Sequence, residues 1–287
     1  MSTSAISSAA VRVADPVAVR GRRFGAAVRW ALPSTTIVVV LVAAWQIYVT
    51  VSGIRPQVLP SPSRIVSQGW AHRAAITENA AATVQVTIVG FAVSLAVAWI
   101  LAVAVDFSPW LRRAVVPLFV VSQTLPIIAI APLLIIWFGF GLLPKILVIA
   151  LATFFPMAIG LIEGFAAADR DARSLLASMG ASRWQQFRYV RLPSAMPRFF
   201  TSLRIGITYA VVGAIFAEYA GASAGLGIYM SQQKNSFRTD LVLAAVLVTA
   251  VISVVLFLLT YVAERFVAPW ALETRALETR PMDRQAQ

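Results

Sequence analysis

The sequence contains no cysteine, a single histidine and two lysines, and only 13% of its 287 residues are charged. The absence of cysteine excludes disulfides, thiol nucleophiles and cysteine-ligated metals. A phosphate-binding loop of the G-x-x-x-x-G-K-[ST] type needs glycine before its lysine, but Lys145 follows Pro144 and Lys234 follows Gln233. We therefore expect no metal site, no cofactor and no ATP site in this chain, and no enzymatic activity of its own.

Apolar residues make up 59% of the sequence, and its mean hydropathy is +0.80. Soluble domains carry roughly a quarter charged residues, so this composition indicates an integral membrane protein. An α-helix needs about 20 apolar residues to cross a bilayer. We therefore expect an all-α polytopic membrane protein with six transmembrane helices, over residues 31–51, 83–105, 116–138, 143–162, 199–220 and 241–262.

The net charge of +12 comes largely from basic residues in the tail over residues 1–29, the loop after the second span, the loop over residues 169–193 and the charged tail over residues 265–287. The positive-inside rule places these segments and both termini in the cytoplasm. Membrane topology thereby explains the basic charge, so we expect contacts with membrane lipids and no nucleic acid partner. The first tail should be disordered, residues 30–77 should form the first span and an outer loop, and residues 78–264 should form the main transmembrane domain.

The third expected span contains Pro117, Pro126 and Pro132. Membrane helices tolerate proline where neighbouring groups satisfy the freed carbonyls. We expect a kinked helix packed among protein and followed by a tight turn at Phe138 and Gly139. On one interpretation the prolines only set the kink, and on the other the kinked helix is a wall of a translocation path.

Glu218 lies at the end of the fifth expected span, where a carboxylate is costly and is by default a functional candidate. It can face a path or pair across a dimer. Alternatively, it can sit at the outer interface and cap the loop that begins at Gly221. We favour a structural role for Glu218 at an external gate.

The loop over residues 169–193 reads as helix, break, helix. Asp169 and Asp171 suit a helix start, because carboxylates there accept free N–H groups and complement the helix dipole. Gly180 stands where a helix end favours a left-handed residue. The spacing i, i+3, i+4, i+7 places four apolar side chains of the first helix on one face, those of Ala172, Leu175, Leu176 and Met179.

The second helix of this loop is predicted by Ser182 and Gln185, which match the capping box S-x-x-Q. It should start at Arg183 and end before Pro193, which restricts Leu192 and lacks an N–H donor. Such an amphipathic hairpin can lie on anionic lipid headgroups through its arginines, or it can dock onto a partner protein. The spacing alone leaves both interpretations open.

A longer spacing adds a family resemblance to this loop. Gly180 is followed, after nine residues, by Val190, and then by Leu192 and Pro193. This resembles the loop of ATP-binding-cassette importer permeases that reads Glu-Ala-Ala, three residues, Gly, nine residues, Ile-x-Leu-Pro, although Ser-Leu-Leu at residues 174–176 replaces Glu-Ala-Ala. In that family the loop is the coupling helix, which sits in a groove of the ATPase. The resemblance therefore implies a coupling role for Ala172, Leu175, Leu176, Met179, Gly180, Ala181, Ser182, Leu192 and Pro193.

Three further stretches resemble one branch of the same family, the permeases for taurine, alkanesulfonates, nitrate and thiamine precursors. They are the Leu-Pro-Ser-Pro-Ser sequence at residues 59–63, the proline-containing run at residues 125–139 and the glycine-rich run at residues 217–227. The resemblance covers residues 58–264. It implies the type I importer permease fold, in which six spans carry a cytoplasmic coupling helix, and it makes residues 78–264 the permease domain.

The resemblance also implies partners. These are a second permease copy, a cytoplasmic ABC ATPase dimer that binds ATP and Mg, and an external or periplasmic solute-binding protein, assembled at the cell inner membrane. ATP-driven closure of the ATPases would switch the translocation path from inward- to outward-facing. We place the following residues at the path or its gate: Pro126, Pro132, Phe138, Gly139 and Glu218.

The leading substrate hypothesis, by analogy with this branch, is a sulfonate, taurine or nitrate-like anion. The alternative is a thiamine or pyrimidine precursor, or another small organic solute. Two other protein classes are an ion-coupled secondary transporter, for which only Glu218 offers a buried carboxylate, and a membrane serine hydrolase that uses Ser223 and His72. The hydrolase motif needs a strand-to-helix turn, whereas Ser223 follows an apolar helix, so we expect an importer permease.

Overall fold

The computed structural model describes residues 16–122, 124 and 126–270, and all regular elements in this part of the chain are helical, as expected. The chain forms two compact units, residues 1–64 and 65–287. The elements are α1 (Pro16–Ser52), α2 (Pro62–Ala71), α3 (Arg73–Phe107), α4 (Pro109–Ser122), α5 (Ile127–Phe138), α6 (Leu142–Ala166), α7 (Arg170–Ser178), α8 (Arg183–Gln186), the π-helical turn η1 (Phe187–Arg191), α9 (Leu192–Gly221), α10 (Leu226–Asn235) and α11 (Thr239–Val267).

In the first unit, α1 begins at Pro16 and so extends into the segment that was expected to be a disordered tail. Residues 1–15 of that tail lie outside the described residues. The part of α1 from Thr35 to Ser52 is long and apolar enough to cross a membrane, which agrees with the first expected span. The N–H of Ser63 donates to Gln46 Oε1 over 3.1 Å, which ties the following loop back to α1.

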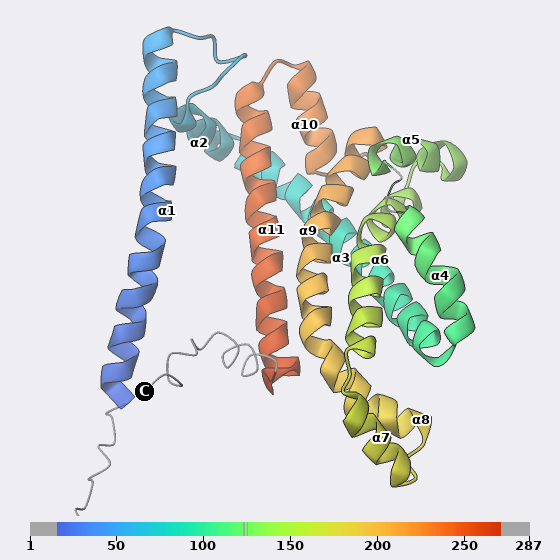
Figure 1. Ribbon diagram of the computed structural model, residues 1–287. Helices are drawn as coiled ribbons and strands as arrows, with labels where there is room; N and C mark the ends of the chain where they lie inside the picture. Colours follow the sequence, from blue (N-terminus) through green and yellow to red (C-terminus); the bar gives the residue numbers. More distant parts are fainter. Residues whose placement is uncertain (1–15, 123, 125, 271–287) are drawn as a thin grey trace, which may run out of the picture. The chain divides into compact units, whose positions relative to one another are not determined.

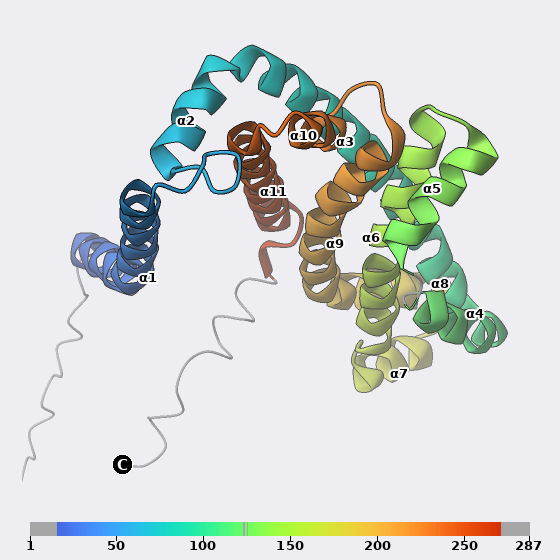
Figure 2. The same cartoon turned by 90° about the horizontal axis from the view of Figure 1, so that it is seen from above.

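In the second unit, α11, α9 and α6 stand side by side, with α4 and α5 on the far side of α6 (Figure 1, Figure 2). Helix α3 crosses this row and packs against α6 and α9. The short helices α7 and α8 lie near one set of ends of these long helices (Figure 1). Helix α10 lies near the opposite ends, against α9 and α11 (Figure 1). The two short-helix regions therefore mark the two ends of the second unit.

The core of the second unit lies where α6 meets α3 and α9. Met157, Leu161 and Phe165 follow one another at four-residue spacing on α6 and are fully buried, as are Ala98 and Ala102 on α3. Four-residue spacing aligns side chains along one face of a helix, so these residues form a continuous stripe. In a bilayer, helix association depends on such close van der Waals packing. The small alanines let α3 approach α6.

Two glycines make the contact between α6 and α9 closer still. A Cβ atom placed on Gly160 would lie 1.8 Å from Ser202 Oγ, and one placed on Gly164 would lie 2.9 Å from the Cα of Ala195. Neither distance is compatible with a side chain at these positions. Small residues at helix interfaces let backbones approach in this way in membrane proteins. The pair α6 and α9 is thereby fixed in one register.

The third expected span is divided rather than merely kinked. Helix α4 ends at Ser122, the backbone turns at Thr124, and α5 begins after Pro126. Proline disfavours α-helical backbone in the residue before it, which explains why the break falls here. Among the described residues, five helices are long and apolar enough to cross a membrane, and the third span is represented by a shorter apolar helix over Ala129–Phe138. The other spans match α1, α3, α6, α9 and α11.

Candidate functional site: a capped hairpin, a buried carboxylate and an exposed helix face

The loop over residues 169–193 is a helical hairpin whose first helix is capped at both ends. Asp169 Oδ1 accepts the N–H of Asp171 over 2.8 Å, which satisfies a free donor at the start of α7. At the other end Gly180 adopts φ +82°, and the N–H of Ala181 donates to the carbonyl of Leu176. This is the Schellman arrangement that ends a helix at a left-handed glycine. The predicted cap and the predicted glycine corner are both confirmed.

The second helix of the hairpin starts at Arg183, as expected. Ser182 Oγ accepts the N–H of Gln185 over 3.3 Å, and Gln185 Oε1 accepts the N–H of Ser182 over 2.7 Å. These two bonds are the predicted capping box. The expected end before Pro193, however, is wrong. The chain continues through η1 directly into α9.

The reason for this continuation is the geometry of η1. In this wider turn, the N–H of Leu192 donates to the carbonyl of Phe187, five residues earlier. Pro193 then occupies the first turn of α9, where its missing N–H does little harm. Ser194 Oγ donates to the carbonyl of Val190 over 2.7 Å. The hairpin and α9 therefore form one uninterrupted helical path.

The apolar face predicted for α7 divides into an inner and an outer pair. Ala172 and Leu176 are half-buried, whereas the side chains of Leu175 and Met179 are 62% and 74% exposed. Two large apolar side chains thus project from a short helix that is capped at both ends. An exposed apolar patch on a rigid element is typical of a protein-protein contact.

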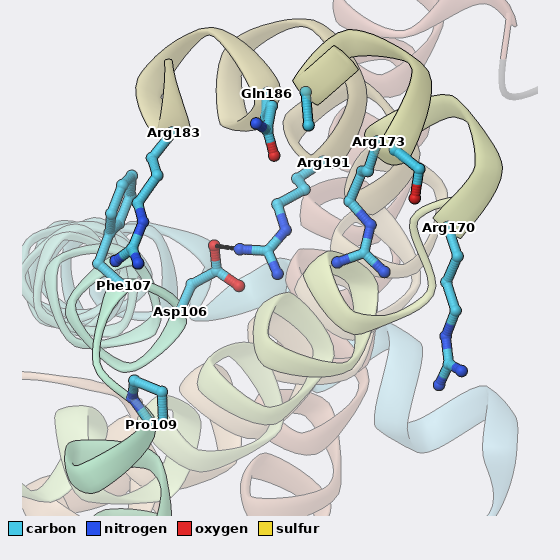
Figure 3. Close-up of a pocket in the computed structure, with 10 residues that line it drawn as sticks. Asp106, Phe107, Pro109, Arg170, Arg173, Arg183, Gln186 and Arg191 are labelled. Carbon is cyan, nitrogen blue, oxygen red and sulfur yellow. Dashed lines mark hydrogen bonds and ion pairs between the residues drawn. The ribbon is translucent and has the colours of Figure 1, made fainter. Parts of the chain in front are cut away.

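A basic cleft lies on the opposite side of α7, between the hairpin and the end of α3 (Figure 3). Its volume is about 530 Å³. Arg191 Nη1 and Asp106 Oδ2 form an ion pair at 2.5 Å, which links the base of the hairpin to α3. The cleft is lined by Asp106, Phe107, Pro109, Arg170, Arg173, Ser174, Ala177, Arg183, Gln186 and Arg191.

Glu218, which the sequence analysis places at the gate of the path, is fully buried near the end of α9. Its Oε2 atom accepts the N–H of Gly227 and the hydroxyl of Thr83, both over 2.9 Å. Thr83 Oγ1 in turn accepts the N–H of Leu226 over 2.8 Å. The carboxylate and the hydroxyl together cap the start of α10, and the carboxylate also complements the dipole of that helix. A Cβ atom on Gly225 would lie 2.2 Å from the carboxyl carbon, which explains the glycine there.

One face of α9 is exposed in the second unit. Ile205, Tyr209, Val212, Phe216 and Tyr219 recur along it at spacings of three or four residues and are all at least one-third exposed. Aromatic and aliphatic side chains therefore share this face along much of the length of α9.

Two hollows open along this exposed face of α9. One has a volume of about 400 Å³ and is lined by residues of α5 and α6 together with Ile205 and Tyr209. The other has a volume of about 520 Å³ and includes Phe216 and Tyr219 in its lining. In the second hollow, Lys234 Nζ donates to the hydroxyl of Tyr219 over 3.1 Å. The face thus combines ring surfaces, hydroxyl groups and concave spaces.

The other residues placed at the path from the sequence lie along α5, and only Pro132 among these described residues lines one of the two hollows. Pro132 lines the second hollow together with Phe216. Pro126 is the N-cap of α5, and Phe138 is its last residue. Gly139 adopts φ +75° and ends α5, as the expected tight turn requires.

Comparison with known proteins identifies the family to which this chain belongs. The family described as binding-protein-dependent transport system inner membrane component matches residues 78–271, which is more than half of the chain. This chain belongs to that family. Its all-helical fold and its apolar helices agree with the permease component of an ATP-binding-cassette importer, which is a multi-pass membrane protein.

Curated relatives of the permease differ in the substrates they are named for. The riboflavin transport system permease protein RibX of Chloroflexus aurantiacus is 34% identical over 241 residues, which cover 83% of this chain and 89% of the relative. The formylaminopyrimidine transport permease protein ThiX of Halalkalibacterium halodurans is 32% identical, covering 84% and 96%. The taurine transport system permease protein TauC of Escherichia coli is also 32% identical, covering 80% and 86%.

Solved structures support the fold of the permease. A chain of an amino acid ABC transporter crystallised with histidines matches with a TM-score of 0.58 at 15% identity, covering 70% of this chain and 97% of that one. A chain of the inward-facing MetNI methionine ABC transporter matches with a TM-score of 0.51 at 20% identity, covering 71% and 98%. The fold expected from the resemblance is thereby confirmed.

Sequence reasoning missed two ion pairs of the permease. Besides the pair of Asp106 and Arg191, Arg204 Nη2 lies 2.5 Å from Glu264 Oε2, and Glu264 is fully buried. The sequence did contain a signal for such pairs: an acidic residue lies near the end of one span, and a basic residue lies near the end of another span on the same side of the membrane. A buried charge needs a partner of opposite sign, so these residues could have been paired.

Proposed function

We propose that this permease forms the translocation path of an ATP-driven importer as a homodimer. Its partners in this proposal are a cytoplasmic ABC ATPase dimer, which holds ATP and Mg, and an external solute-binding protein. Both termini and the α7–α8 hairpin face the cytoplasm of a cell whose inner membrane holds the protein. The concentration of basic residues in these segments supports this orientation.

The hairpin is the coupling element of the proposal. The exposed side chains of Leu175 and Met179 support a docking role, because they project from a helix that is already held in shape by its own caps. A preorganised contact loses little entropy on binding. The half-buried side chains of Ala172 and Leu176 face the rest of the hairpin, and Gly180 forms the turn between α7 and α8. Ala181, Ser182, Leu192 and Pro193 complete the coupling segment: the first two close the caps, and the last two join it to α9.

The exposed face of α9 forms the wall of the path, and this observation carries the proposal. Helix α11 offers a comparison, since the middle of its exposed face carries the aliphatic Val251, Val254 and Leu258, as expected for contact with lipid tails. Its exposed aromatic side chains, Phe257, Tyr261 and Phe266, lie toward its last turns. The face of α9 instead carries Tyr209 and Tyr219 beside hollows. A second copy of the permease would enclose this face and close the path.

The lining of this face favours a ring-containing solute over a sulfonate or nitrate. Tyr209, Phe216 and Tyr219 offer planar apolar surfaces, on which heteroaromatic rings stack well. An anion would need a cation, and Lys234, the one basic side chain among the described residues that line either hollow, already donates to Tyr219. Among the relatives, RibX and ThiX are named for heteroaromatic compounds. Taurine remains the second candidate because TauC is as similar to this chain as ThiX.

Ion-coupled transport is not favoured by the geometry. The carboxylate on which that alternative rested, Glu218, accepts hydrogen bonds from Gly227 and Thr83 and caps α10. This leaves it engaged within the fold rather than facing a path.

Reconstituted uptake tests the proposal. The permease is placed in proteoliposomes with the cassette ATPase and the solute-binding protein that co-purify with it from its native membrane, and uptake of riboflavin, a formylaminopyrimidine and taurine is measured with and without ATP. We expect ATP-dependent uptake of a ring compound. Tyr209→Ala should reduce this uptake up to about tenfold, since a lost aromatic contact is worth about 0.5–1.5 kcal/mol.

The matched control is Val251→Ala on the exposed face of α11, which should leave uptake unchanged. ATP-independent uptake driven by a proton or sodium gradient would overturn the importer assignment. ATP-driven uptake of taurine alone would keep the importer and replace the substrate class.

A further inference from the structure

The lining of the basic cleft beside α7 holds more basic than acidic side chains. Arg170, Arg173, Arg183 and Arg191 line it, and Asp106 is the one acidic residue among the described residues of the lining. Asp106 is already paired with Arg191. Guanidinium groups that share one cleft repel each other, and an anion among them would relieve that repulsion.

The side chains are arranged for such an anion. Arg173 and Arg191 extend toward the space beside Asp106, Arg183 lies on the other side of Asp106 next to Phe107, and Arg170 lies farther out (Figure 3). Arg173 Nε donates to the carbonyl of Asp169, which holds its guanidinium in place. Planar guanidinium groups bind phosphate oxygens in pairs, so several arginines around one space are typical of a phosphate site.

The cleft lies at the end of α3, where a helix that crosses the membrane would reach the phospholipid headgroups. It is closed on one side by Asp106 and Phe107 at the end of α3, a helix long enough to span the membrane, and by Pro109 at the start of α4. Trp184, which stacks on Phe107 at 6.3 Å, and Trp110 are 59% and 76% exposed beside it. Exposed tryptophans gather at membrane interfaces, where headgroups begin.

The hairpin uses opposite faces for the cleft and for its apolar contact. Arg170, Arg173 and Ala177 lie on one side of α7 at three- and four-residue spacing, and Leu175 and Met179 project from the other. A protein docked on the exposed apolar pair therefore leaves the basic face to a different ligand.

We propose that this cleft binds a phosphate group, supplied by an anionic phospholipid of the membrane in which the permease sits. The headgroup phosphate lies among Arg173, Arg183 and Arg191, and the acyl chains leave past Trp184 toward the bilayer. The bound lipid ties the hairpin to the end of α3, so that the position of the hairpin depends on the anionic lipid content of the membrane.

Native mass spectrometry of the full-length permease in detergent tests this proposal. The purified chain is titrated with dioleoyl phosphatidylglycerol, with dioleoyl phosphatidylcholine and with inorganic phosphate, and the bound species are counted. The cleft variant is Arg173→Gln with Arg183→Gln. The matched control is Arg113→Gln with Arg188→Gln, which removes the same charge from exposed arginines that do not line the cleft.

We expect one phosphatidylglycerol to bind in preference to phosphatidylcholine. Because each basic residue near an anionic lipid contributes about 1 kcal/mol, the cleft variant should bind about thirtyfold more weakly. The control should stay within about twofold of the unmodified protein. Thermal unfolding of all three proteins verifies that the variants are folded.

Each other outcome decides the question as well. Inorganic phosphate that binds as tightly as the lipid and displaces it would keep the phosphate site and assign it to a soluble ligand. Equal weakening in both double variants, or no anion bound at all, would overturn the proposal. Intact lipid binding in the cleft variant would overturn it as well. The measurement needs neither ATPase nor substrate, so a failed uptake assay does not bear on it.

Discussion

Removing the carboxylate of Glu218 should unfold the end of the second unit that holds α10. Glu218→Ala leaves the buried N–H of Gly227 without its acceptor, and the Thr83 hydroxyl then keeps only its contact with the carbonyl of Asn79 over 3.2 Å. An unsatisfied buried polar group costs about 1–3 kcal/mol. Loss of the negative charge at the start of α10 adds about 0.3–2 kcal/mol. We therefore expect Glu218→Ala to lower the free energy of unfolding by about 1.5–5 kcal/mol.

The conservative change separates the acceptor from the charge. Glu218→Gln keeps an oxygen that can accept from Gly227 and loses only the charge, so its cost should be about 1–2 kcal/mol. For a chain of this size 1 kcal/mol shifts the midpoint of thermal unfolding by about 2–4 °C. The expected shifts are thus roughly 3–20 °C for alanine and roughly 2–8 °C for glutamine.

The assay is thermal unfolding of the detergent-purified permease, followed by its intrinsic tryptophan fluorescence. Glu163→Ala is the matched control, because Glu163 is exposed and lies in another helix. It should shift the midpoint by no more than about 1–2 °C. If Glu218→Ala unfolds at the same temperature as Glu163→Ala, the carboxylate does not clamp α10 and its role must be sought in transport.

Three further changes probe other parts of the permease. Gly160→Ala should destabilise it by about 1–3 kcal/mol, because the new methyl group collides with Ser202, and a second change of Ser202→Gly should restore part of the unfolding midpoint. Leu175→Glu should abolish transport-coupled ATP hydrolysis in proteoliposomes while thermal stability stays within about 0.5 kcal/mol, since the side chain is exposed. Glu264→Leu should cost about 3–5 kcal/mol by removing the buried acceptor of Arg204, and the double change Arg204→Met with Glu264→Leu should be markedly more stable than the single one, as measured by the unfolding midpoint.

The features that could be predicted from the sequence are those fixed by neighbouring residues. The caps of the hairpin are examples, since Asp169 bonds to a residue two positions away and Ser182 to one three positions away. Their geometry follows from the local chain, so the pattern of residue types is sufficient. Five of the six expected spans were predicted for a similar reason, because the apolar run and the bilayer thickness determine a helix by themselves, whereas the third span is divided before Pro126.

The features that could not be predicted join distant parts of the chain. Glu218 and its partner Thr83 are 135 residues apart, and Arg191 and Asp106 are 85 apart. Nothing in the neighbourhood of either residue selects its partner, since helix packing decides which side chains meet. The continuation of the helix through Pro193 has a different cause, because the π-helical turn before it changes the backbone register.

The chain runs without a break from α8 through η1 into α9. A movement of the hairpin can therefore be transmitted along α9 to its exposed aromatic face. A helix of 30 residues such as α9 is about 45 Å long. If the hairpin were pushed so that this rod tilted by about 5°, its far end, which carries Tyr219, would swing by about 4 Å. A small movement of the hairpin at one surface of the membrane would thus displace Tyr219 at the other surface by about the width of an aromatic ring. No change of secondary structure between the two would be needed.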